Sequence, residues 1–340
     1  MNILLSSLCS VGGISGREGA VRDRIIEEIK DVCTYKIDAL GNLITFKQGA
    51  ARPACKLMLA AHMDEVGFVV HHITDDGFLK VLCVGGVEPS VLAGARVLVG
   101  TQSIPGVVST LPVHLLSKDE KEIPLKHEQL TVDIGARDKA DALEHVQLFD
   151  AVTFMPHYEE TDGMFSAKAL DDRAGVAVLI DLIRRNLPFD LHFVFTVQEE
   201  IGLRGAKTAA FGVIPDAAIV IDATTAADLP EVTNEKRVCS LSGGPVISFM
   251  DAKTMYDQAL YNLTFKTARG LGIPCQPKTL PTGGNDAGAI HLSRTGVRTI
   301  AVSLPCRYLH APVSVIAKSD FDHAIDLIFA LAQKIAGGEF

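Results

Sequence analysis

The chain has 340 residues, of which 48% are apolar and 21% are charged, and its formal net charge is −9. This composition is typical of a globular protein with a large buried core, and it excludes a disordered chain. The negative charge argues against a nucleic-acid partner, and no apolar run approaches the ~18 residues of a membrane span.

The first segment, Met1–Leu5, is apolar but has neither a basic stretch nor a small-residue cleavage site, so we interpret it as the start of a helix. Further along, Val21, Ile25, Ile29 and Val32 recur at helical spacing among charged residues, which predicts an amphipathic helix. The seven cysteines form no Cys-x-x-Cys pair, and their number is odd. Such scattered cysteines favour reduced thiols, and we expect the protein to be cytoplasmic.

An apolar run at residues 57–61 predicts a buried strand that ends at the motif His62-Met63-Asp64. The sequence pattern then changes: residues 67–162 consist of short β-rich runs separated by Gly, Asp and Pro turns. We interpret this segment as a small inserted β domain, although a long extension of the main sheet would show a similar pattern. The expected main domain consists of residues 1–66 and 163–340.

After Lys168 the pattern alternates between helices and strands again. A helix is predicted through residues 175–183, strands at 192–197, 217–221 and 299–302, and a last helix after the N-cap residues Ser319 and Asp320. This alternation predicts an α/β fold with a mixed, mainly parallel sheet covered by helices on both faces.

Acidic and histidine residues recur where these elements begin or end. They are His62 and Asp222 after two strands, Asp171 at a helix start, the pair Glu199 and Glu200 after a third strand, and His310 after a fourth. Each has an ordinary structural explanation when taken alone: a helix cap for Asp171, a solvated loop for the glutamates, a turn for Asp222, and a hydrogen-bonded core residue for His310.

Together, the two imidazoles and the three carboxylates of Asp171, Glu200 and Asp222 indicate a metal site. Zn²⁺ accepts such nitrogen and oxygen ligands, as do Co²⁺ and Mn²⁺. Two ions about 3.5–4 Å apart need a carboxylate between them, which leaves one histidine and one acid for each ion and a water or hydroxide in the shared space. The pattern therefore predicts two divalent ions per chain, with Zn²⁺ preferred.

The words HMDEVG, KALDDR, QEEIGLRGA, the Asp after AIVI, GGNDAGA and CRYLH occur in an order that resembles the TET or glutamyl-aminopeptidase family. These proteins are dinuclear, co-catalytic metallo-aminopeptidases, and the likeness spans nearly the whole chain. The resemblance implies that His62 and Asp222 bind one metal, that Glu200 and His310 bind the other, and that Asp171 bridges them. Glu199 matches the general base, and Asp64 matches the acid that holds the His62 ring.

The same resemblance implies that the insert is a β-barrel-like dimerisation domain. It also implies a homo-oligomer, at least a dimer and in this family typically a tetrahedral dodecamer, that takes short peptides as substrates. Two positions depart from the usual words: Asn285 stands where the family has Thr, and Ala311 follows His310 where a hydroxyl residue is common. Both bear on substrate preference more than on catalysis.

Two other interpretations stay open at this point. A di-metal deacylase or carboxypeptidase on a related fold would need an arginine to clamp the substrate carboxylate, and Arg204 and Arg307 are candidates. A non-catalytic assembly protein with a vestigial site would not need the base Glu199. A glycoside hydrolase would leave the histidines unexplained, because it needs two opposed carboxylates and no metal.

Overall fold

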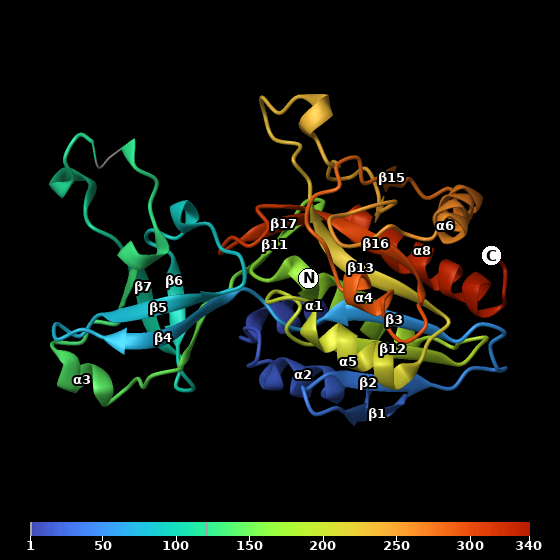
Figure 1. Ribbon diagram of the computed structural model, residues 1–340, viewed down its shortest axis with the longest axis horizontal. Coiled ribbons are helices and arrows are strands. Elements are labelled where there is room, and N and C mark those ends of the chain that lie inside the picture. Colours follow the sequence, from blue (N-terminus) through green and yellow to red (C-terminus); the bar gives the residue numbers. More distant parts are fainter. Residues whose placement is uncertain (1, 120–121) are drawn as a thin grey trace.

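The computed structural model describes residues 2–119 and 122–340, which form a large mixed sheet with helices and a separate closed barrel (Figure 1). The large sheet has eleven strands, nine of which follow one another across it. Their order is β1 (Thr34–Ile37), β2 (Leu43–Lys47), β12 (Leu191–Thr196), β3 (Leu57–His62), β13 (Ala217–Thr225), β16 (Arg298–Arg307), β17 (Ser314–Ala317), β11 (Met164–Ala167) and β10 (Tyr158–Thr161). The short strands β14 (Val246–Ile247) and β15 (Gln276–Pro277) extend the sheet from β16.

The four central strands, β12, β3, β13 and β16, are parallel to one another. The strands on either side of them, β1, β2, β17, β11 and β10, form antiparallel pairs. All six residues of β3 are buried. Parallel strands covered on both faces have continuous apolar sequences, which is why Leu57–Ala61 is one unbroken apolar run. The helices that pack on this sheet and around its edges are α1 (Ile3–Ser10), α2 (Gly19–Ile29), α4 (Leu170–Arg184), α5 (Arg204–Val213), α6 (Gln258–Leu271), α7 (Ala287–Ile290) and α8 (Lys318–Ala336).

The barrel has its own apolar core, separate from the core of the large sheet. Its strands close in the order β4 (Gly67–Ile73), β5 (Leu79–Val84), β8 (Thr131–Asp133), β7 (Ile104–Ser109), β6 (Arg96–Val99) and β9 (Ala151–Phe154). The short helix α3 (Lys139–Leu143) and the 3₁₀ turns at Pro89–Val91, Val113–Leu115 and His127–Gln129 lie in its connections. Figure 1 shows the barrel standing beside the large sheet, joined to it at one end.

These observations confirm the predicted fold class, a mixed and mainly parallel sheet with a small inserted barrel. The domain division at residues 67 and 162 stays a prediction. The barrel strands span Gly67–Phe154, and β10 pairs with β11 in the large sheet. Within the described residues, no helix is long and apolar enough to cross a membrane.

One predicted helix start is wrong. Helix α8 begins at Lys318 with Ala317 at its N-cap, so Ser319 and Asp320 lie inside its first turn. The Asp320 carboxylate instead accepts hydrogen bonds from the backbone N–H groups of Ser242 and Gly244, at 2.7 and 2.8 Å. A tertiary contact has therefore replaced the local capping bond that the sequence pattern favoured.

The imidazole of His192 on β12 makes the stability of the fold depend on pH. Burial, together with the positive charges of Lys56 and Lys36, lowers the pKa of His192 to about 4. As the pH falls, His192 is protonated in the unfolded chain before it is protonated in the folded chain. The contribution of neutral His192 to the free energy of unfolding is therefore complete above about pH 6.5 and is lost towards pH 4. We expect the melting temperature of metal-free protein to fall more steeply over this range in the wild type than in His192→Phe. Equal slopes in thermal melts would contradict this.

Candidate metal centre

The carboxylate of Asp171 lies at the centre of the predicted site and faces both histidines. Its Oδ1 is 3.1 Å from Nε2 of His62, and its Oδ2 is 3.4 Å from Nε2 of His310. One carboxylate thus offers a separate oxygen to each imidazole, as a bridging ligand would.

The remaining two candidate ligands complete one pair on each side of Asp171. Asp222 Oδ1 is 3.9 Å from Nε2 of His62, and Glu200 Oε2 is 3.3 Å from Nε2 of His310. Ligand atoms of His62, Asp171 and Glu200 lie within 4.8 Å of one another. The five side chains predicted from the sequence are therefore brought together, and we call the two pairs the His62 half and the His310 half.

The outer nitrogens of both rings fix how the rings face the site. Nδ1 of His62 lies 3.0 Å from the backbone oxygen of Asp64, and Nδ1 of His310 lies 2.8 Å from the backbone oxygen of Gly86. A carbonyl oxygen only accepts, so each Nδ1 donates, and the Nε2 lone pair of a neutral ring points to the carboxylates. Lone pairs facing carboxylate oxygens suit a cation between them, so the donor set fits divalent metal ions.

The electrostatics of the site also favour cations. Burial, together with the charge of Asp171, raises the pKa of Glu200 to about 7 and the pKa of Asp222 well above its usual range. Although burial opposes this shift, protonated His310 and His62 hold the pKa of Asp171 below its usual range when no metal is bound. The site thus gathers buried carboxylates without enough positive charge of its own, and bound cations would supply that charge.

The sheet explains why residues far apart in sequence meet here. His62 ends β3, and Glu199 and Glu200 follow the neighbouring strand β12. Asp222 lies inside β13, which continues to Thr225 and is longer than the sequence predicted. His310 follows β16, the next parallel strand. Because parallel strands end at one edge, this edge collects the side chains from three connections.

Asp171 enters the site through an irregular helix start. The backbone of Asp171 and Asp172 is not helical although α4 includes both residues, and the peptide bond between them is cis. Asp172 binds backbone groups, although its carboxylate also lies within 4.8 Å of ligand atoms of His62 and Asp222. Its Oδ1 accepts the backbone N–H of Gly175 at 3.0 Å, and its Oδ2 accepts that of His62 at 3.3 Å. The first acid of the pair is thus free to face both histidines, while the second holds the backbone.

Asp64 lies behind His62 and holds more than the imidazole ring. Its Oδ1 is 3.4 Å from Nδ1 of His62. The backbone oxygen of Asp64 lies nearer to the same nitrogen, at 3.0 Å. The carboxylate also accepts the hydroxyl of Ser15 and the backbone N–H groups of Glu199 and Glu200, at 2.6, 3.0 and 3.1 Å. Burial opposes ionisation, but these bonds and His62 keep the pKa of Asp64 below its usual range. Asp64 thus ties the His62 strand to the loop of the two glutamates.

Glu199 differs from Glu200, whose Oε2 lies 3.3 Å from Nε2 of His310, because its own carboxylate has neither a hydrogen bond nor an ion pair with the described residues. Burial raises the pKa of Glu199 well above its usual range; His62 opposes the shift, and the negative charges of Asp286 and Glu200 add to it. A carboxyl group with a raised pKa next to a metal site is suited to accept and return a proton.

Asp286, in the GGNDAGA word, is a site neighbour to which the sequence assigned no role. Its Oδ2 accepts the hydroxyl of Thr196 at 2.5 Å, and its Oδ1 is buried without a hydrogen-bond partner among the described residues. Burial raises the pKa of Asp286 to about 6. The only available signal was the word itself, because nothing in its local pattern indicates burial.

A buried ionic cluster lies behind the site and connects three segments of the chain. The Lys168 ammonium is 2.8 Å from both oxygens of Glu65, and the Arg173 guanidinium is 3.4 Å from one of them. Arg173 also donates to the carbonyl groups of Met63, Leu8 and Val11. The cluster therefore holds the His62 segment against the start of α4 and the end of α1.

Removing one partner from this cluster should strongly destabilise the fold. Glu65→Gln leaves Lys168 and Arg173 buried without their counter-charge, and we expect a loss of about 3–5 kcal/mol in the free energy of unfolding. Denaturant unfolding of metal-free protein measures this loss. The control is Glu339→Gln, which breaks a surface ion pair with Lys334 and should leave stability unchanged. Similar midpoints for both variants would contradict the prediction.

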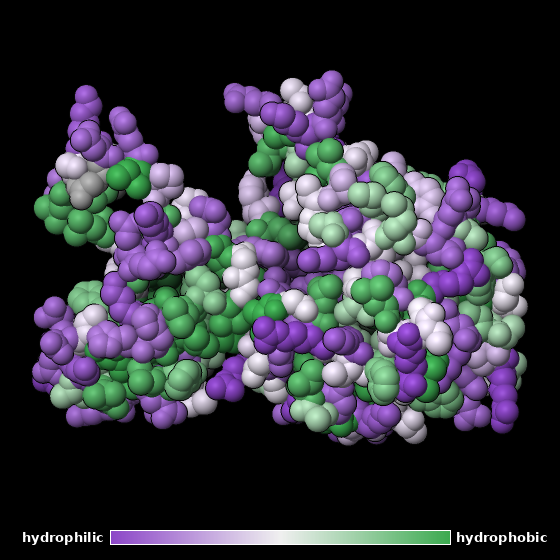
Figure 2. Space-filling model, viewed as in Figure 1, coloured by the Kyte–Doolittle hydropathy of each residue, from purple (hydrophilic) through white to green (hydrophobic). Residues whose placement is uncertain are grey.

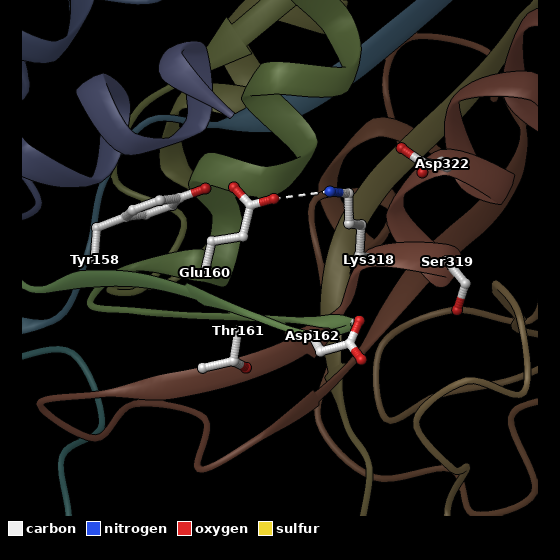
Figure 3. A pocket seen from close by; sticks show the side chains of 8 residues that line it. Tyr158, Glu160, Thr161, Asp162, Lys318, Ser319 and Asp322 are labelled. Carbon is white, nitrogen blue, oxygen red and sulfur yellow. Dashed lines mark hydrogen bonds and ion pairs between the residues drawn. The ribbon is translucent and has the colours of Figure 1, made fainter. Parts of the chain in front are cut away.

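One open pocket lies away from these residues. It has a volume of about 740 Å³ and is lined by the turn between β10 and β11 and by the start of α8. Figure 3 shows the Glu160 carboxylate paired with the Lys318 ammonium, at 2.7 Å. None of the five candidate metal ligands lines this pocket, so its size alone does not mark the functional site.

Known proteins resemble this chain along nearly its whole length. The model of the family described as M42 glutamyl aminopeptidase matches residues 41–327. A lysyl aminopeptidase from Pyrococcus furiosus is 34% identical, with 99% of this chain and 98% of that protein covered. A TET aminopeptidase structure from Thaumarchaeota archaeon SCGC AB-539-E09 is 31% identical with a TM-score of 0.94, covering 98% of this chain and 95% of that one.

A second solved structure, the TET1 peptidase from Pyrococcus horikoshii, is 35% identical with a TM-score of 0.85, covering 96% of this chain and 98% of that one. That peptidase can assemble into a tetrahedron or a large octahedral shell. Because the family match covers most of the sequence, and the relatives align along nearly their whole length, the chain belongs to the M42 glutamyl aminopeptidase family and is an aminopeptidase.

Proposed function

We propose that the chain is a dinuclear metallo-aminopeptidase that removes N-terminal residues from short peptides. His62 and Asp222 would hold one divalent ion, Glu200 and His310 the other, and Asp171 would bridge both. The observation that carries this proposal is the carboxylate of Asp171, which turns one oxygen to each histidine. The nitrogen and oxygen donors suit Zn²⁺ first and Co²⁺ or Mn²⁺ as substitutes.

The chain's own residues supply the proton transfers. When bound, the ions provide Lewis acidity, which polarises a scissile carbonyl and makes water more acidic. Glu199 takes a proton from the attacking water and returns it to the leaving amine. Asp64 keeps the His62 ring in place and, through the backbone of Glu199 and Glu200, holds the base next to its metal-binding neighbour.

The structure favours an aminopeptidase over a carboxypeptidase or a deacylase. Arg307, a candidate clamp for a substrate carboxylate, already forms two hydrogen bonds with Asp228, at 2.7 and 2.9 Å. Arg204, the other candidate, is an exposed residue at the first position of α5. A free α-amine, by contrast, would bind the carboxylates or the proposed metal ions of this site.

The choice between these activities is testable with paired substrates. We expect chelated enzyme to regain hydrolysis of amino-acid p-nitroanilides when Zn²⁺ or Co²⁺ is added, and to leave their N-acetylated counterparts intact. The panel should cover acidic, basic and aliphatic residues, because the sequence does not indicate a side-chain preference. Faster hydrolysis of the acetylated substrates, or none of any free-amine substrate with metal bound, would reject the aminopeptidase proposal.

The proposal includes a homo-oligomer, at least a dimer and in its full form a tetrahedral dodecamer built through the barrel. Support comes from the assembly of the Pyrococcus horikoshii peptidase and from the surface of the barrel. Figure 2 shows apolar side chains over much of the barrel, where Leu82 and Phe149 are 55% and 71% exposed. Large exposed apolar areas are typical of protein–protein contacts. We also place the enzyme in the cytoplasm, because its seven cysteines are all free.

A further inference from the structure

The turn Gly85-Gly86 leaves the barrel after β5 and reaches the metal centre on the large sheet. Val87, the next residue, is 5% exposed and belongs to the apolar core of the barrel, as does Val66 at the end of the HMDEV segment. The apolar core of the barrel therefore holds the turn through Val87, which follows it, and through Val66, which packs beside Gly85.

The turn touches both ligands of the His310 half. The backbone oxygen of Gly86 accepts the hydrogen bond from Nδ1 of His310, at 2.8 Å. Gly85 has φ +85°, and a methyl group there would lie 3.3 Å from Cβ of Glu200 and 2.7 Å from Cγ1 of Val66. Only glycine fits this position without strain and without displacing neighbours, so the backbone of the turn packs directly against the Glu200 side chain.

The His62 half is held in a different way. Its histidine donates to the backbone oxygen of Asp64 within the same segment, and its acid, Asp222, lies in the central strand β13. The buried cluster of Glu65, Lys168 and Arg173 secures that segment from behind. The His62 half is thus fixed by the large sheet, whereas the His310 half depends on a backbone group from the inserted barrel.

We propose that the Gly85-Gly86 turn is a positioning element that sets the metal affinity of the His310 half alone. This inference rests on the proposed function, because it assumes that each half holds an ion. A partner that orients a ligating histidine typically changes metal affinity by about 10- to 100-fold. The inserted barrel would then contribute to the metal site directly, without supplying a ligand.

Gly85→Ala tests this, because a methyl group at φ +85° next to Val66 and Glu200 must shift the turn. We titrate the metal-free variant with Co²⁺ and monitor binding by calorimetry and by cobalt absorbance. We expect one binding event of wild-type affinity and one whose affinity is weakened by about 10- to 100-fold. The matched control is Gly94→Ala, at a barrel glycine with φ +80° where no atom of the described residues, its chain neighbours aside, lies within 4 Å of the position of an added Cβ. It should bind both ions as the wild type does.

His310→Ala identifies which half has changed. If the turn acts through His310, Gly85→Ala should have little further effect on Co²⁺ binding in the His310→Ala background, so the two substitutions are not additive. Additive losses, equal weakening of both events, or unchanged binding in Gly85→Ala would each overturn the inference. A wild-type chain that binds fewer than two ions would instead overturn the proposed function, and this inference with it.

Wild-type protein provides a test if Gly85→Ala does not fold. Hydrogen exchange of the peptide that contains residues 84–88 should be slower with both halves loaded with Co²⁺ than in metal-free protein, and Co²⁺ should not slow it in His310→Ala. An exchange rate that is the same in the metal-free and fully loaded wild type would overturn the inference.

Discussion

Replacement of Glu199 by Gln should lower kcat by about 10²- to 10⁴-fold while two metal ions stay bound. The amide has nearly the shape of the carboxylate but accepts no proton, and the Glu199 carboxylate makes no hydrogen bond with the described residues that the change would break. Metal analysis and peptide hydrolysis on one preparation measure both quantities.

The neighbouring residue offers a contrast for this experiment. Glu200→Gln changes a proposed ligand whose Oε2 lies 3.3 Å from Nε2 of His310, so metal should be lost together with activity. If Glu199→Gln kept its turnover, the base assignment would be wrong.

Asp171→Asn should cause the largest loss, because one change affects both halves of the site. An amide offers one oxygen instead of two and carries no charge, so it cannot bridge two cations between His62 and His310. We expect the bound metal to fall well below two ions per chain and hydrolysis to fall to background. Metal analysis after dialysis against a weak chelator, with activity measured in parallel, tests this.

Asp181→Asn is the control on the same helix. Asp181 pairs with Arg185 near the surface, at 2.7 Å, and has no contact with the metal centre among the described residues. This variant should keep both ions and full activity. Two tightly bound ions in Asp171→Asn would contradict the bridging role.

The sequence predicted which side chains gather at this site, because each candidate ligand lies next to a recognisable element. The apolar run before His62 and the apolar run before Asp222 became neighbouring parallel strands, and the carboxyl ends of parallel strands meet at one edge of the sheet. The β-rich sequence pattern of residues 67–162 also predicted an inserted β domain. Its closure into a barrel was not predictable from texture, because closure depends on which strands pair and not on their composition.

Other features had no sequence signal because they arise from long-range contacts. The His310 ring donates its hydrogen bond to the backbone oxygen of Gly86, and a carbonyl group is the same at every residue. No local pattern around Lys168 and Arg173 indicates that both are fully buried against Glu65. Asp320 looked like a helix cap and instead binds a distant loop.

The most direct test of the dinuclear site is a crystal structure of the cobalt-loaded enzyme with anomalous scattering measured at the cobalt edge. We predict two anomalous peaks per chain about 3.5–4 Å apart, one between His62 and Asp222, the other between Glu200 and His310, with an oxygen of Asp171 on each. A single peak, or two peaks that do not share Asp171, would contradict the proposed site.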